Sequence, residues 1–132
     1  MLTLQSVFPK TAPATIAVVE DVEDNRSVLR ALLDEYYNIH EFENGAAFVA
    51  SLDQTNYDLV LLDLSMPGMD GFGVLERVQD HPTQRLIPVI AVTAHAMHGD
   101  REKALAVGFR DYVTKPFDFD VILACIRRHL SS

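Results

Sequence analysis

Leu59-Val-Leu-Leu-Asp63 is the stretch that decides the fold, because four consecutive aliphatic residues lead directly into a carboxylate. A short apolar run of this kind predicts a strand that is buried on both faces. Such strands occur in parallel sheets that are covered by helices on both sides. Ligands of these sheets bind outside the carboxyl ends of the strands, so Asp63 is expected at the mouth of a site.

Three further apolar runs, rich in β-branched or aromatic residues, are followed by polar residues in the same way. These runs and their polar ends are Ile16-Ala-Val-Val19 with Glu20 and Asp21, Pro88-Val-Ile-Ala-Val92 with Thr93, and Tyr112-Val113 with Lys115. The carboxyl ends of parallel strands lie at one end of the sheet. The polar side chains are therefore expected to converge around Asp63.

Between the strands, apolar residues recur three and four positions apart, which is the spacing of a helix that covers a sheet. Asp24 or Asn25 suits the N-cap of the first helix, and Asp118 suits that of the last. Gly108 suits a left-handed C-cap. The apolar positions of the first and third helices are Val28, Leu29, Leu32, Leu33, Tyr36, Phe72, Val74, Leu75 and Val78. Those expected to face a core from the last helix are Val121, Ile122, Cys125, Ile126 and Leu130.

The order of elements predicts the fold class. A strand and a helix alternate five times with short connections, as expected for an α/β fold with a doubly wound five-stranded parallel sheet. The second strand is expected over residues 38–42, and the third is expected to begin near Tyr57. Residues 1–14 carry Pro9 and Pro13 without a sustained period, so we expect an N-terminal tail before a single domain over 15–130. With a length of 132 residues, no separate output domain is expected.

The composition narrows the possible partners and the compartment. Asp+Glu 19 against Lys+Arg 11 gives a net charge of -8, so no direct nucleic-acid or membrane partner is expected, although Arg127-Arg128 is a local basic patch. The single cysteine, Cys125, excludes an internal disulfide and is expected to be buried filler. No apolar stretch reaches the roughly 18 residues of a membrane helix, and a cytoplasmic location is expected.

The converging side chains suit phosphoryl chemistry. Glu20, Asp21 and Asp63 would place three carboxylates in one crevice, and such anions repel one another unless a cation lies among them. Mg²⁺ is the expected cation, because it prefers oxygen ligands and is held by carboxylates together with a phosphate. Thr93 supplies a hydroxyl that can donate to a phosphoryl oxygen, and Lys115 supplies a neutralising ammonium.

Each of these residues also has a structural explanation. Asp63 could cap the following helix or turn, and Glu20-Asp21 could belong to a solvated acidic turn. Thr93 could fill a strand, and Lys115 could be a surface charge. Their joint placement at the ends of strands favours the functional interpretation.

Two local features are expected to shape the loops around the site. Pro67 and Gly68 suit the central positions of a type II turn, and Gly71 lets the backbone enter the next helix without a side-chain clash. A cis peptide bond is predicted between Lys115 and Pro116, because it would aim the lysine inward.

Other kinds of site are poorly supported by the sequence. The five histidines form no convincing metal set, since His95 and His98 lie three apart but lack thiols and nearby imidazoles as further ligands. Ser65 follows no Gly-x-Ser-x-Gly elbow, which argues against a serine hydrolase. The chain contains no Gly-rich phosphate loop.

Four motifs, in order along the chain, resemble those of the receiver domain of two-component response regulators. They are Val18-Val-Glu-Asp21, Asp63-Leu-Ser-Met-Pro-Gly-Met-Asp-Gly71, Val92-Thr-Ala94 and Asp111-Tyr-Val-Thr-Lys-Pro-Phe117. The resemblance covers residues 15–130 and implies a flavodoxin-like (βα)5 domain with strand order 2-1-3-4-5. The expectation is a protein of the receiver-only type.

The resemblance also implies a role for each site residue. Asp63 would be the phosphoacceptor, and Asp21 would bind Mg²⁺ directly. Glu20 would assist, and the backbone carbonyl of Ser65 would complete the metal site.

Further residues would hold and report the phosphoryl group. By the same resemblance, Thr93 and Lys115 hold it, and Tyr112 is the aromatic residue of the switch. Ser65 and His95 lie two positions after Asp63 and Thr93, where the resemblance implies that side chains tune the lifetime of the acyl phosphate.

The resulting hypothesis is a phosphorylation-dependent switch. It would accept a phosphoryl group from a histidine kinase or a histidine phosphotransfer protein and then bind a downstream protein target. It would be an enzyme only in that it catalyses its own phosphoryl transfer and autodephosphorylation.

Two alternatives stay open at this point, and a third is disfavoured. The chain could be a phosphate-independent interaction module of the same fold, or a receiver excised from a hybrid histidine kinase. A phosphohydrolase with an aspartyl nucleophile is disfavoured, because such enzymes typically need an acid at the position of Ser65.

Overall fold

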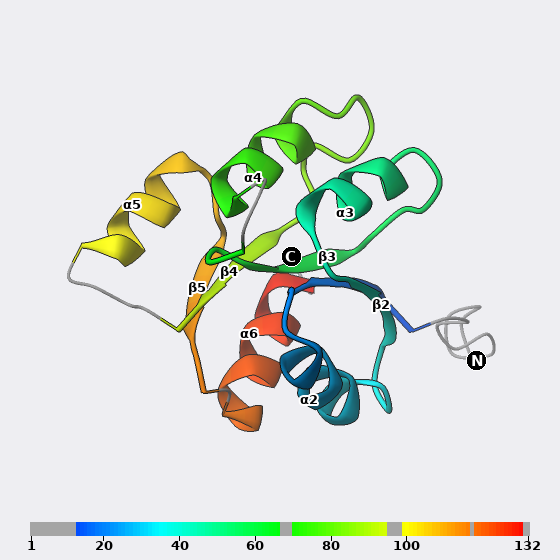
Figure 1. Ribbon diagram of the computed structural model, residues 1–132, viewed down its shortest axis with the longest axis vertical. Helices are drawn as coiled ribbons and strands as arrows, with labels where there is room; N and C mark the ends of the chain where they lie inside the picture. Colours follow the sequence, from blue (N-terminus) through cyan, green and yellow to red (C-terminus); the bar gives the residue numbers. More distant parts are fainter. Residues whose placement is uncertain (1–12, 67–69, 95–98, 117, 131–132) are drawn as a thin grey trace, which may run out of the picture.

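The computed structural model describes residues 13–66, 70–94, 99–116 and 118–130 (Figure 1). Strands and helices alternate along them. The elements are β1 (Thr15–Val19), α2 (Glu23–Leu33), β2 (Asn38–Phe42), α3 (Gly45–Ser51), β3 (Leu59–Asp63), α4 (Gly71–Gln79), β4 (Val89–Thr93), α5 (Asp100–Val107), β5 (Asp111–Thr114) and α6 (Phe119–Leu130). The strands pair in parallel in the order β2-β1-β3-β4-β5, which confirms the predicted fold and strand order.

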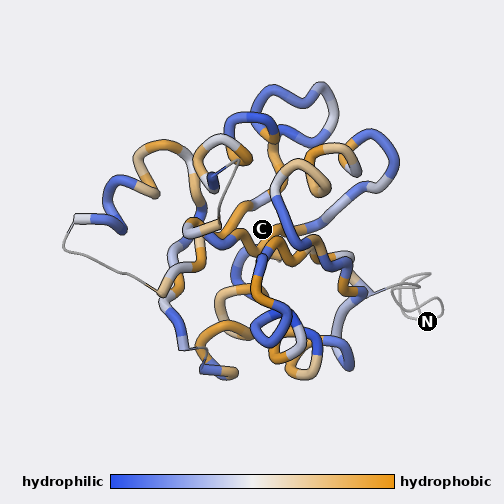
Figure 2. Tube along the Cα trace, in the orientation of Figure 1, coloured by the Kyte–Doolittle hydropathy of each residue, from blue (hydrophilic) through white to orange (hydrophobic). Residues whose placement is uncertain are grey.

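Two layers of helices cover the sheet. Along β1, Ala17 and Val19 pack into the core beneath α3, α4 and α5, while Ile16 and Val18 pack into the core beneath α2 and α6. Figure 1 shows these two helix groups on opposite sides of the strands, and Figure 2 shows the apolar residues concentrated between them. Burial on both faces explains why β3 and β4 have continuous apolar sequences.

Several predicted turn residues have the expected geometry. Gly108 ends α5 with φ of 122°, and the Asp118 carboxylate accepts a hydrogen bond from the N–H of Val121 at the start of α6. A Cβ added to Gly71 would overlap the Leu64 side chain and lie 3.0 Å from the Leu64 Cα, so only glycine fits at the start of α4.

The predicted N-cap of α2 is wrong. Val22 occupies the cap position without a side-chain hydrogen bond, and Asp24 and Asn25 lie within the first turn. The Asn25 amide instead donates to Glu20 Oε1 at 3.3 Å, so it supports the end of β1 rather than its own helix.

The exposed sides of the helices carry more apolar residues than expected. Val121 is 56% exposed, so its predicted core-facing position is wrong. Val28, Tyr36 and Phe72 are also exposed, although they share the helical spacing of buried neighbours. Cys125 is buried, as predicted.

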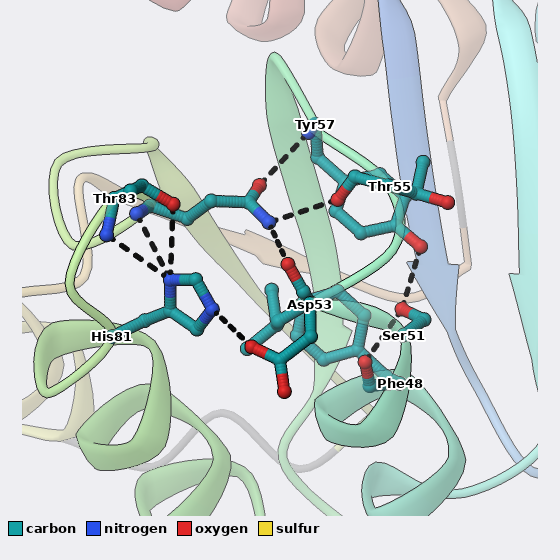
Figure 3. Close-up of polar contacts among 9 residues, drawn as sticks. Phe48, Ser51, Asp53, Thr55, Tyr57, His81 and Thr83 are labelled. Atoms are coloured by element: carbon teal, nitrogen blue, oxygen red, sulfur yellow. Dashed lines mark hydrogen bonds and ion pairs between the residues drawn. The ribbon is translucent and has the colours of Figure 1, made fainter.

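A buried amide side chain, that of Gln84, holds together the loops at the end of the sheet where the strands begin. We call this end the amino end. Gln84 is 3% exposed. Its Oε1 accepts the Tyr57 N–H at 2.9 Å, and its Nε2 donates to the carbonyls of Leu52 at 2.6 Å and Thr55 at 2.8 Å (Figure 3). Tyr57 therefore lies in a loop contact, and β3 begins at Leu59 rather than near Tyr57.

A histidine supports this loop from the other side. His81 Nδ1 accepts the backbone N–H groups of Thr83 and Gln84, each at 3.2 Å, and His81 Nε2 lies 2.9 Å from Asp53 Oδ1 (Figure 3). Because Nδ1 accepts two amides, the proton of the neutral ring lies on Nε2 and faces the carboxylate. His81 is thus a structural residue of the amino end.

Some predictions fall on residues that the structure does not describe. They concern residues 1–12 of the tail, the Pro67-Gly68 turn, and His95 with His98. Within the described ranges, no helix combines the length and the apolar character needed to cross a lipid bilayer.

Candidate functional site

The predicted site residues lie at the carboxyl end of the sheet, where β1, β3, β4 and β5 stop. The strand register pairs Val19 with Leu62, Asp63 with Val92, and Thr93 with Thr114. The residues that follow these pairs therefore leave neighbouring strands at the same level. This alignment is what brings side chains distant in sequence together.

Asp63 occupies the centre of this group. It is 3% exposed, its Oδ1 accepts the Ser65 N–H at 2.8 Å, and its Oδ2 accepts the Lys115 ammonium at 3.3 Å. Asp63 thus caps the turn that follows it, but not the following helix, because the Asp70 side chain accepts the Gly73 N–H there. The carboxylate is therefore held by the loop that follows β3 and by Lys115, the residue after β5.

Glu20 and Asp21 have different environments. Glu20 is 2% exposed, and its side chain accepts hydrogen bonds from Val22 N–H at 3.0 Å and from Lys115 Nζ at 2.5 Å. Burial raises the pKa of Glu20 above its ordinary value, because the Lys115 and Val22 hydrogen bonds only partly offset the loss of hydration and Asp63 adds repulsion. Asp21 is exposed, so only one of the two acids belongs to a solvated turn.

Lys115 bridges the two buried carboxylates. Burial alone would lower the pKa of Lys115, but the hydrogen bond to Glu20 and the charges of Asp63 and Glu20 outweigh it and raise that pKa. The lysine is therefore a fixed positive charge. It follows β5, where its own N–H donates to the Thr93 carbonyl at 2.8 Å, and the predicted cis bond to Pro116 is present.

The acidic set fits a magnesium ion. One oxygen from each of Glu20, Asp21 and Asp63 can be chosen so that all lie within 4.8 Å of one another. One lysine cannot balance three carboxylates, and Mg²⁺ prefers such oxygen ligands and retains several waters. The exposed Asp21 leaves one side of the set open to those waters and to a phosphate.

Thr93 and Tyr112 lie on the other side of Asp63. Thr93, 4% exposed, and Tyr112, 9% exposed, line a hollow of about 290 Å³ that Ser65 and Phe72 also border. Burial, with a smaller contribution from the Asp100 carboxylate, raises the pKa of Tyr112. The hollow is thus bordered by a hydroxyl and an aromatic ring.

The remaining predicted positions have a simpler outcome. Ser65 is exposed next to Asp63, where its backbone holds the carboxylate, and its carbonyl stays a predicted metal ligand. His95 lies outside the described residues.

Two supporting residues were missed from the sequence. Arg26 Nη1 donates to the Glu20 carbonyl at 2.8 Å, and the Asn25 amide reaches the Glu20 side chain. Both residues lie in the first turn of α2. The signal that could have identified them is their place in the sequence. Polar residues in the first turn of the helix that follows a strand lie close to the end of that strand.

A family model and curated relatives match most of the chain. The model described as the response regulator receiver domain matches residues 16–127. The response regulator PleD of Caulobacter vibrioides is 42% identical over 115 residues, which cover 86% of this chain and 25% of PleD. The signal transduction histidine-protein kinase BarA of Shigella flexneri is 41% identical over 105 residues, 79% of this chain and 11% of BarA. The chain spans a quarter or less of the length of these two relatives.

A solved structure supports the same assignment. The receiver domain of the sensor histidine kinase PA1611 from Pseudomonas aeruginosa, with a magnesium ion coordinated in its active site cleft, superposes with a TM-score of 0.84. It is 33% identical and covers 92% of this chain and 100% of that domain. The chain therefore belongs to the response regulator receiver domain family of two-component signalling.

Proposed function

We propose that this chain is a phosphorylation-dependent switch that accepts a phosphoryl group on Asp63 from a histidine kinase or a histidine phosphotransfer protein. The observation that carries the proposal is the buried contact of Asp63 Oδ2 with Lys115 Nζ at 3.3 Å, inside a set of three carboxylates. A buried carboxylate beside one fixed cation and a place for a second is suited to attack a phosphorus atom.

The transfer uses few groups. An Asp63 oxygen attacks the phosphorus of the phosphohistidine in line, the phosphorus–nitrogen bond breaks, and the released imidazole takes a proton from solvent. The Lys115 ammonium neutralises charge on the transferred oxygens, and the Thr93 hydroxyl donates to one of them. Mg²⁺ bound by Glu20, Asp21, Asp63 and the Ser65 carbonyl would supply further charge neutralisation.

The reverse process sets the lifetime of the signal. Water attacks the phosphorus of the acyl phosphate, and the oxygen–phosphorus bond to Asp63 breaks to release inorganic phosphate. Ser65 and His95 would control access of this water. The protein would thus catalyse its own phosphorylation and autodephosphorylation.

The signal would leave the site through Thr93 and Tyr112. The phosphorylated Asp63 presents new acceptor oxygens, and movement of the Thr93 hydroxyl toward them changes the hollow that it shares with Tyr112. The surface of β4, β5, α5 and α6 would then differ between the two states and bind a downstream protein. A net charge of -8 favours a protein partner over nucleic acid or membrane, and the location proposed is the cytoplasm.

The test is phosphorylation by a small acyl phosphate in the presence of Mg²⁺, followed by intact mass spectrometry. The wild-type protein should gain one phosphoryl group, and Asp63→Asn should gain none. Asp80→Asn, which changes an exposed aspartate after α4, is the matched control and should be phosphorylated normally. A folded wild-type protein that stays unmodified would overturn the proposal in favour of a phosphate-independent interaction module.

A further inference from the structure

A second group of ligand-type side chains lies at the amino end of the sheet, at the opposite end of β5 from Lys115. Asp111 begins β5 and pairs with Ile90, whereas Thr114 ends it and pairs with Thr93. The length of this strand separates the group from the Asp63 site by about 10 Å along the sheet. We call Asp111, Cys125 and His129 the Asp111 cluster.

We propose that the Asp111 cluster is a second metal site, for a soft divalent cation such as Zn²⁺. One ligand atom from each residue lies within 4.8 Å of the other two. Cys125 and His129 are one helical turn apart on α6, so both side chains lie on the same face of that helix. A thiol, an imidazole and a carboxylate are the ligand types that zinc takes in proteins.

Two distances within the Asp111 cluster are close to those between neighbouring ligands of a tetrahedral site. Cys125 Sγ lies 3.4 Å and His129 Nε2 lies 3.1 Å from Asp111 Oδ2. With metal–ligand bonds of about 2.0–2.3 Å, neighbouring ligands of a tetrahedral zinc ion are about 3.3–3.5 Å apart. Small side-chain adjustments would therefore suffice for coordination, and a water would complete the tetrahedron.

The carboxylate is already oriented for this role. Asp111 Oδ1 accepts the Tyr112 N–H at 2.9 Å and is approached by Arg101 at 3.3 Å, so Oδ2 is the oxygen turned toward the thiol and the imidazole. Hydrogen bonds that hold the second oxygen of a ligating carboxylate are typical of metal sites.

Arg128 competes with a cation for the same oxygen. Its guanidinium donates to Asp111 Oδ2 at 2.7 Å, and the Arg128 side chain is 63% exposed. Metal binding would release this guanidinium to solvent, and the metal ion would replace its positive charge at the buried Asp111 carboxylate. The Cys125 thiol, whose pKa burial raises to about 12, would give its proton to solvent on coordination.

Because the two sites offer different ligand types, we expect each of them to bind a different metal ion. Mg²⁺ prefers oxygen ligands and seldom binds thiolate or imidazole, so it should occupy the carboxylates around Asp63. Zn²⁺ should prefer the Asp111 cluster because of its sulfur and nitrogen ligands.

Titration of the full chain with Co²⁺ under reducing conditions tests the proposal. Cobalt replaces zinc in tetrahedral sites, and a thiolate–cobalt bond gives a near-ultraviolet charge-transfer absorption. Because the chain has a single cysteine, this absorption can come only from Cys125. We expect saturation at one ion per chain, displacement by Zn²⁺, and no displacement by Mg²⁺.

Variants distinguish coordination from a structural Arg–Asp contact. His129→Gln should weaken cobalt binding at least about tenfold, and Cys125→Ser should abolish the absorption. His40→Gln, an exposed histidine on β2, is the matched control and should bind normally. Arg128→Gln should strengthen binding severalfold, because it removes the competing guanidinium.

Three outcomes would overturn the proposal. They are a folded wild-type protein without the thiolate absorption, equal affinity in His129→Gln and wild type, and absorption that develops only as the native circular dichroism is lost. Arg128→Gln and His129→Gln keep the test decisive if Cys125→Ser fails to fold, since both residues lie toward the surface.

Discussion

The two ends of the sheet both bury carboxylates, but they neutralise them in different ways. At the carboxyl end, Glu20 and Asp63 share one lysine, and the exposed Asp21 adds a third negative charge without adding a cation. At the amino end, the single carboxylate of Asp111 forms ion pairs with two arginines and accepts a hydrogen bond from a backbone N–H. One end is short of positive charge, whereas at the other end arginines already neutralise the carboxylate.

This difference decides what a cation must displace in order to bind at each end. A carboxylate that arginines balance stabilises the native state without a metal ion, and a metal ion can bind it only by displacing a guanidinium. A cluster of carboxylates that lacks positive charge attracts a cation directly. The pKa shifts have opposite directions for the same reason. Burial raises the pKa of Glu20, while the hydrogen bonds that Asp111 accepts outweigh its burial and hold its pKa well below the usual range.

Removal of the lysine at the carboxyl end should have the largest effect. Lys115→Met should slow phosphorylation by a small acyl phosphate about 100-fold or more, because it removes the ammonium that neutralises negative charge on the transferred oxygens. The measurement is the rate of mass gain at saturating Mg²⁺. Arg77→Met removes an exposed charge from α4 and should leave the rate unchanged. A variant that loses stability but transfers at the wild-type rate would show that Lys115 serves folding alone.

At the amino end, the largest loss should follow from removal of the buried amide. Gln84→Leu keeps most of the volume but leaves the Tyr57 N–H and the carbonyls of Leu52 and Thr55 without partners. We expect the free energy of unfolding in urea to fall by about 2–4 kcal/mol. Gln54→Leu, at an exposed position, should change it by less than about 0.5 kcal/mol. A Gln84→Leu variant as stable as Gln54→Leu would mean that water replaces the amide.

The carboxyl end was the more predictable of the two from sequence. Its residues follow directly from strand ends, because parallel register aligns Asp63 and Thr93 whatever the details of packing. The amino end depends on contacts that the sequence does not mark. Nothing in the pattern pairs Gln84 with Tyr57, 27 residues apart, or Asp111 with Cys125, 14 residues apart.

The helices show the second limit of sequence patterns. Helical spacing identified their positions but not the width of the buried stripe, so Val28, Phe72 and Val121 are exposed beside buried neighbours. The cap of α2 was missed because Asn25, a good capping residue, is engaged by Glu20 across the loop. In both cases a tertiary contact overrides a local preference.

The Asp111 carboxylate should make the stability of the amino end depend on pH. A lowered pKa in the native state means that the stabilisation is complete above the unfolded pKa of about 3.9 and is lost as pH falls below it. Asp111→Asn should therefore cost about 1–3 kcal/mol at pH 7 and progressively less below about pH 4. Urea unfolding of both proteins from pH 7 to pH 3 measures this. A difference that stays constant over that range would contradict the assignment.

The smallest effect we predict is the stabilisation of the protein by Mg²⁺ bound at the carboxyl end. It tests whether the shortage of positive charge at that end is met by a metal ion. At about ten times its dissociation constant, an ion that binds only the native state adds about 1.4 kcal/mol to the free energy of unfolding. Asp21→Asn should remove this gain, because it takes an oxygen ligand from the open side of the site, whereas Asp80→Asn should retain it. Chelation should return the wild-type protein to its metal-free midpoint. If Mg²⁺ stabilises Asp21→Asn and the wild type equally, Asp21 is not a ligand of the ion, and the open side of the three-carboxylate set is not where Mg²⁺ binds.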